Sequence, residues 1–148
     1  MKDTEKYTAD LLRGRVSVKS LIHDLKSLNG LVKWSGGCGL RAVGNKSAFE
    51  QLVKALNDKD PNVRVAAARG LGWMRDKKAV EPLIERLKDD DHEVRLAAIK
   101  ALGDIGDKKA TPPLRQLFEN EFEKENIDAT IFIAALKSLA DIYIQTYS

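Results

Sequence analysis

A repeat of 31 residues constrains the fold of this chain more than any other feature. Residues 60–72 (DPNVRVAAARGLG) align without a gap with residues 91–103 (DHEVRLAAIKALG). At the same offset, residues 76–83 (DKKAVEPL) align with residues 107–114 (DKKATPPL). A unit of this size is too small to bury its own apolar face, so successive units must stack into one continuous core.

Each unit predicts two helices. Val63, Ala67 and Leu71 recur at helical spacing, as do the residues 31 positions later, and Asp60 stands where an N-cap would accept backbone N–H bonds. The second helix must begin shortly before Pro82, because a proline deeper in a helix would break it at a cost of about 3 kcal/mol.

We therefore expect an all-α fold, a right-handed α-solenoid (superhelix) of stacked helix pairs with about four repeats, in one domain that spans residues 1–148. Its expected parts are an N-terminal cap with a partial repeat (1–27), repeats at 29–58, 60–89 and 91–120, and a C-terminal capping helix (127–147). The offset grows by six residues before the last helix, within residues 119–126, which predicts a longer helix or a protruding loop.

The repeat also resembles a known family. The run V-R-x-A-A-x-x-x-L-G followed by D-K-K-A-V-E-P-L, at residues 63–72 with 76–83 and at 94–103 with 107–114, is similar to the HEAT-like repeats named after phycobilisome lyases. The resemblance extends over roughly residues 17–142 and implies the solenoid. It does not imply one function, because such repeats serve scaffolds, enzyme subunits and nucleic-acid binders alike.

Composition sets the class of protein. The chain carries 25 basic and 22 acidic residues, a net charge of +3, and has no apolar run long enough to span a membrane. The first residues lack the apolar stretch of a signal peptide, and the single cysteine, Cys38, has no internal disulfide partner, which suits a reducing compartment. We expect a cytoplasmic protein that does not enter a membrane.

The sequence does not indicate an enzyme. Deoxyhypusine hydroxylase, which is built from similar repeats, binds iron through paired His-Glu motifs in its first helices. The positions in register here hold Val65-Ala66 and Leu96-Ala97, which cannot ligate a metal. No phosphate-binding glycine loop or nucleophile motif occurs either. We expect no catalytic residue, no metal site and no cofactor.

The second helices of such solenoids usually line the concave face, where partners bind. Lys54, Glu85 and Gln116 form one register row of mixed charge on these helices. Trp73, in register with Asp104, is expected to be exposed unless it packs over a neighbouring helix. Mixed polarity suits a protein or peptide ligand, and tryptophan is enriched where binding energy concentrates. The leading prediction is a non-catalytic protein-interaction or scaffold module.

Two alternatives stay open. The turns within units are basic and those between units acidic, so stacking predicts a basic edge that contains Lys77, Lys78, Lys108 and Lys109. Such an edge would suit a nucleic-acid-binding module, although HEAT-like DNA glycosylases use a basic concave groove instead. The second alternative is an accessory subunit of a lyase-type enzyme.

The C-terminal helix carries too many apolar residues for one buried face. We expect it to pack against a second copy or another protein, through residues such as Phe132, Ile144 and Tyr147, unless the chain end bends to cover them. Arg64 and Arg95, by contrast, are expected to be structural, paired with aspartates in the turns between units (Asp60, Asp89 or Asp91).

Overall fold

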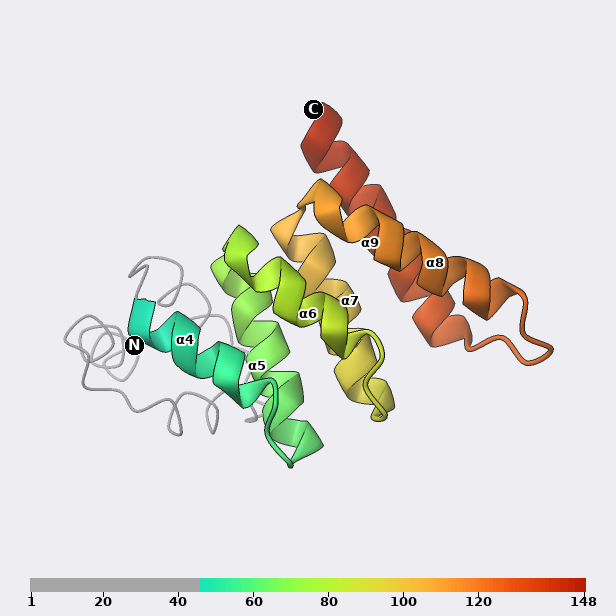
Figure 1. The fold of residues 1–148 in the computed structure, drawn as a ribbon. Coiled ribbons are helices and arrows are strands. Elements are labelled where there is room, and N and C mark those ends of the chain that lie inside the picture. Colours follow the sequence, from blue (N-terminus) through green and yellow to red (C-terminus); the bar gives the residue numbers. More distant parts are fainter. Residues whose placement is uncertain (1–45) are drawn as a thin grey trace, which may run out of the picture.

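The computed structural model describes residues 46–148, with side chains from Phe49 onward. The predicted N-terminal cap with its partial repeat (1–27) and the first part of the 29–58 repeat lie outside the described residues. The described elements are α4 (Lys46–Ala55), α5 (Pro61–Met74), the 3₁₀ helix η1 (Lys77–Ala79), α6 (Val80–Arg86), α7 (His92–Ile105), the 3₁₀ helix η2 (Lys108–Ala110), α8 (Thr111–Phe122) and α9 (Ala129–Tyr147) (Figure 1). This part of the chain contains no β-strand.

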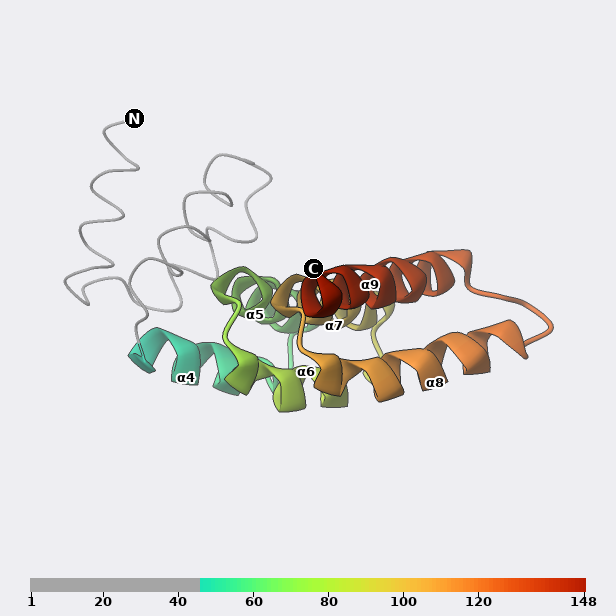
Figure 2. The ribbon, with the colours of Figure 1, turned by 90° about the horizontal axis from the view of Figure 1, so that it is seen from above.

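The helices form two layers. α5, α7 and α9 lie side by side in one layer, and α4, α6 and α8 form the other (Figure 2). Within the first layer α7 packs between α5 and α9. The all-α solenoid of stacked helix pairs is therefore confirmed, while its right-handedness stays a prediction.

The first helix of each unit begins where the sequence predicts. The Asp60 carboxylate accepts a hydrogen bond from the Asn62 N–H before α5, and the Asp91 carboxylate accepts one from the Val94 N–H before α7. Both aspartates have the extended backbone typical of N-caps. Arg75 follows α5 as its C-cap and Gly106 follows α7 as its C-cap, and both capping residues adopt the left-handed conformation.

The second helix of each unit starts through a 3₁₀ turn. Asp76 caps η1 by accepting from the Lys78 N–H, and Asp107 caps η2 by accepting from the Lys109 N–H. Pro82 is the third residue of α6, and Pro113 is the third of α8. Both prolines therefore lie in the first turn, where a missing N–H leaves no intrahelical hydrogen bond unmade.

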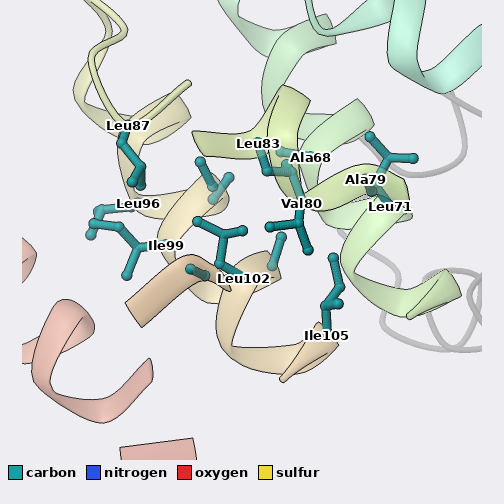
Figure 3. Close-up of a cluster of buried hydrophobic side chains, with 14 of the residues drawn as sticks. Ala68, Leu71, Ala79, Val80, Leu83, Leu87, Leu96, Ile99, Leu102 and Ile105 are labelled. Carbon is teal, nitrogen blue, oxygen red and sulfur yellow. The ribbon is translucent and has the colours of Figure 1, made fainter. Parts of the chain in front are cut away.

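The core lies between the two layers. Leu71 of α5, Leu83 of α6 and Ile99 and Leu102 of α7 are fully buried and gather in one cluster (Figure 3). Alanines fill the same cluster wherever helices of the first layer approach one another. Burial of one such leucine contributes about 1.5–3 kcal/mol, so the repeat stabilises itself chiefly through these side chains.

Small residues allow the close approach of neighbouring first-layer helices. A Cβ atom added to Gly72 of α5 would lie 2.8 Å from the Ala101 Cα of α7. One added to Gly103 of α7 would lie 2.7 Å from the Ser138 Oγ of α9. Ser138 Oγ donates a 2.8 Å hydrogen bond to the Ile99 carbonyl, which joins α9 to the backbone of α7.

The six-residue insertion produces both a longer helix and a loop. α8 continues to Phe122, whereas α6 ends at Arg86, and a loop then leads to α9. The buried Glu121 carboxylate holds this loop, because it accepts hydrogen bonds from the Lys124 ammonium and the Asp128 N–H.

Candidate binding surfaces

The predicted row on the second helices is exposed. Lys54 of α4, Glu85 of α6 and Gln116 of α8 occupy equivalent positions, and all three side chains are open to solvent. We call these three residues the second-helix row. Neighbouring exposed positions are also mixed in charge, with Glu81 on α6 and Lys88 in the turn that follows it. The row presents polar groups of both signs on one layer of a packed scaffold.

Trp73 does not join this row. It lies on α5, in the first-helix layer, and its half-buried ring packs against the hydrophobic core. The expectation of an exposed tryptophan was therefore wrong. Its register partner Asp104 is exposed, but an indole at the end of α5 covers core side chains that a carboxylate cannot.

The four lysines of the predicted basic edge lie on the two 3₁₀ helices. Lys77 and Lys78 lie on η1, Lys108 and Lys109 lie on η2, and all four side chains are exposed. Within residues 46–148 none of the four forms an ion pair. The turns that carry η1 and η2 lie at one end of the helix pairs, opposite the α4–α5 and α6–α7 turns (Figure 1).

At the acidic end, much of the negative charge serves the stacking. The Asp89 Oδ1 lies 3.0 Å from the Arg64 Nη2, and its Oδ2 lies 3.3 Å from the Arg86 Nη1. Arg64 also reaches the exposed Asp90 carboxylate at 3.2 Å and donates to the Asp58 carbonyl at 2.8 Å. The predicted pairing of Arg64 with Asp89 is confirmed. One arginine thus links the α4–α5 turn to the α6–α7 turn.

The charges in this network shift each other's titration. The hydrogen bond to Asp89 raises the pKa of the Arg64 guanidinium. Burial alone would raise the pKa of the Asp89 carboxyl, but hydrogen bonds from the Asp91 N–H and from Arg64 hold that pKa below its usual range. The Asp89 side chain is only 3% exposed, so its charge depends on these donors.

Arg95 repeats only half of this arrangement. Its Nη1 donates to the Asp89 carbonyl at 2.7 Å and to the Asp90 carbonyl at 3.1 Å, as Arg64 does one unit earlier. No carboxylate among residues 46–148 lies within ion-pair distance of Arg95. The predicted aspartate partner of Arg95 was therefore wrong within the described part of the chain.

One contact had no counterpart in the sequence analysis. His92 Nε2 lies 2.8 Å from the Asp128 Oδ2, which joins the first turn of α7 to the N-cap of α9. Burial would raise the pKa of the Asp128 carboxyl, but the Ile131 N–H and His92 lower it overall. The His-Asp separation spans the insertion, so no local motif could have indicated it.

The outward face of α9 is apolar and exposed. We call it the α9 stripe, and it consists of Ile133, Leu136, Ala140, Tyr143, Ile144 and Tyr147. The five large side chains are between 51% and 75% exposed. The exposure of Ile144 and Tyr147 agrees with the sequence analysis. Phe132 does not belong to the stripe, because its half-buried ring stacks on Phe118 of α8 with centroids 4.4 Å apart.

Residues 46–148 contain no group of three or more histidine, cysteine, aspartate or glutamate side chains that could hold a metal ion. Among the helices described, none has the length and apolar content required to cross a bilayer.

The family follows from comparison with known proteins. HEAT repeats match the sequence over residues 20–93 and 49–132, which together cover most of the chain. The chain belongs to the HEAT repeat family. No curated protein is similar enough in sequence to count as a relative.

Solved structures agree with this assignment. A chain in the complex of CpcE and CpcF of phycocyanin lyase from Nostoc sp. PCC7120 is similar to this HEAT-repeat protein, with 26% identity and a TM-score of 0.62 over 88% of this chain. An engineered protein has 22% identity and a TM-score of 0.56 over 86% of this chain, which shows the fold alone. The chain spans 55% and 62% of these two proteins, respectively.

Proposed function

We propose that this HEAT-repeat protein is a non-catalytic scaffold that binds a protein or peptide on its second-helix layer. The observation that carries the proposal is the second-helix row, in which Lys54, Glu85 and Gln116 stand exposed at equivalent positions on three packed helices. A partner segment that lies across the layer would meet a cation, an anion and an amide in order. Polar groups held by a fixed scaffold give specificity because they lose little freedom on binding.

The mixed row does not favour nucleic acid. A phosphate backbone would be bound by repeated lysine or arginine, whereas the central position of the row is Glu85. The four lysines of the basic edge are available for an anion, but they lie on η1 and η2, before the second helices begin, whereas Lys54 and Glu85 lie in the last turns of α4 and α6. We assign them an auxiliary role toward acidic groups of a protein partner.

The similarity to a chain of the CpcE–CpcF complex supports a protein partner, because that complex joins two proteins. The same similarity supports the second alternative, in which this chain is an accessory subunit of a lyase-type enzyme. In that case the partner on the second-helix row would be another subunit, and this chain would supply binding and no catalytic group.

Site-specific photocrosslinking tests the proposal. A crosslinking amino acid at Glu85 should capture a defined protein from the source lysate, whereas one at Asn62, which is exposed on α5 in the other layer, should not capture it. The K54E/E85K variant should lose this capture, and a variant with glutamate at all four basic-edge lysines should retain most of it. Capture that needs the basic edge, or that nuclease abolishes, would overturn the proposal in favour of nucleic acid.

A further inference from the structure

The α9 stripe has the spacing of a helix-packing surface. Ile133, Leu136, Ala140, Tyr143 and Tyr147 follow one another at intervals of three and four residues, so they form one line along the 19-residue helix. The opposite side of α9, which includes Ile131, Ala135 and Ile142, is buried against α7 and α8. α9 is therefore apolar on two sides, although it is covered on only one.

The uncovered side corresponds to a face that is covered one unit earlier. The run at residues 137–142 aligns with residues 100–105, which places Ile133, Leu136 and Ala140 in register with Leu96, Ile99 and Gly103 of α7. In α7 all three of these residues are buried. α9 covers them, since Ser138 packs on Gly103 and donates to the Ile99 carbonyl. The α9 stripe is therefore a stacking face that no helix among residues 46–148 covers.

We propose that a second copy of this chain covers the α9 stripe, so that two α9 helices cross antiparallel at Ala140 in a symmetric dimer. The stripe is nearly symmetric about Ala140. Ile133 and Tyr147 lie seven residues before and after it, and Leu136 and Ile144 lie four residues before and after it. A patch that pairs with itself about a two-fold axis must have this self-complementary form.

The residue at the proposed crossing point is small, as are the residues at the contacts between first-layer helices. First-layer helices already meet through small residues, Gly72 against Ala101 and Gly103 against Ser138. Ala140 is the small residue at the next position, and it is exposed. Two alanines at the crossing allow the helices to approach, while the large side chains on both sides interdigitate.

Charge is also compatible with a second copy. Lys137 is the exposed charged residue on α9 beside the stripe, and it lies three residues before Ala140, as Tyr143 lies three residues after it. In an antiparallel crossing each Lys137 therefore meets Tyr143 of the second copy, where an ammonium is attracted to the aromatic face. The two lysines do not face each other.

Sedimentation equilibrium tests the dimer. The wild-type chain should change from its monomer mass of 16.5 kDa toward twice that value, with a Kd on the order of micromolar. The variant L136R/Y143R should weaken this association by about 100-fold, because both exposed residues lie near the centre of the interface. The matched control N57R/N62R adds the same two positive charges at exposed positions on either side of the α4–α5 turn, away from α9, and should dimerise like the wild type. A monomer at all concentrations, or a dimer that L136R/Y143R leaves intact, would refute the proposal.

Disulfide trapping tests the orientation. In a C38S background, A140C should form an intermolecular disulfide on oxidation, and I133C alone should not, whereas a mixture of I133C and Y147C should give the mixed disulfide. Efficient self-crosslinking by I133C would show a parallel crossing and overturn the antiparallel geometry. Circular dichroism of each variant confirms that it is folded. Because these readouts do not involve the second-helix row, the dimer and the proposed function can fail independently.

Discussion

The two register-equivalent arginines allow the contribution of the buried ion pair to be isolated. R64M removes the bonds to the inter-unit carbonyls and also one of the two arginine partners of Asp89, whereas R95M removes carbonyl bonds of the same kind alone. Loss of one partner from a buried pair costs about 3–5 kcal/mol, because the other charge stays buried. Loss of the carbonyl bonds costs about 1–2 kcal/mol. Because Arg86 and the Asp91 N–H still contact the Asp89 carboxylate in R64M, the cost of the lost pair should fall short of this range. We expect R64M to destabilise the protein by about 2–3 kcal/mol more than R95M.

The pH dependence gives an independent check on the same pair. The Asp89 pKa lies below its unfolded value in the folded protein, so the pair stabilises the fold above an unfolded pKa of about 3.9 and loses this effect as pH falls through the folded pKa. The difference in the free energy of unfolding between wild type and R64M should therefore be largest at neutral pH and should decrease in the acid range. R95M should show no comparable narrowing.

Urea unfolding followed by circular dichroism measures these free energies, with R64K as a further control that keeps the charge but loses the two-pronged geometry. Equal costs for R64M and R95M at neutral pH would refute the reasoning, since the carboxylate would then contribute nothing beyond the carbonyl bonds. A difference that persists unchanged at pH 2 would show that packing of the side chain, rather than charge, accounts for it.

Three further predictions follow from individual contacts. G72A should lower stability by about 1–3 kcal/mol in urea unfolding because its Cβ would meet the Ala101 backbone, although helix propensity alone predicts a gain of about 1 kcal/mol. D104N should raise the Tm at pH 7. Although the Asp104 side chain is open to solvent on one side, its carboxyl lies beside Gly72 of α5, and desolvation there raises its pKa in the folded state. Its charge therefore opposes folding at neutral pH, and the gain in Tm should vanish below the ordinary aspartate pKa. H92A should speed amide hydrogen exchange at Ile131, because the Ile131 N–H donates to the Asp128 cap that His92 contacts. It should lower the free energy of unfolding by less than about 1 kcal/mol. Unchanged exchange would show that His92 does not support the cap.

Local chemistry made the repeat units predictable. Asp60 and Asp91 cap their helices as expected, because a carboxylate before an apolar run satisfies the free N–H groups of the first turn. Pro82 and Pro113 indicate where the second helices start, because proline is tolerated in the first turn of a helix and not in its interior. These rules depend on neighbours in the sequence, and the 31-residue period then placed the units in one stack.

The predictions for Arg95 and Phe132 were wrong for the same reason. The partners available to both residues depend on the insertion, and the 31-residue period does not determine these partners. Arg95 lacks a carboxylate because the position in register with Asp89 is Asn120, and Glu121, the next acidic residue, instead holds the inserted loop. Phe132 is half-buried because its ring stacks on Phe118 and lies beside Phe122, which belongs to the lengthened part of α8. The insertion changes partners in space, whereas a register argument assumes that partners repeat.

Despite the insertion, α9 keeps the pattern of small and apolar residues that α7 has at the positions in register. This pattern is typical of a helix that packs against another helix, and a helix that only caps a solenoid does not need it. A terminal helix that only closes a solenoid needs a polar outer face, and no constraint would hold its outer residues small or apolar. α9 has Ala140 where α7 has Gly103, and it has Ile133 and Leu136 where α7 has buried apolar residues. Exposed apolar side chains in a continuous line favour association or aggregation. Their match to a covered face is best explained by a helix that packs there.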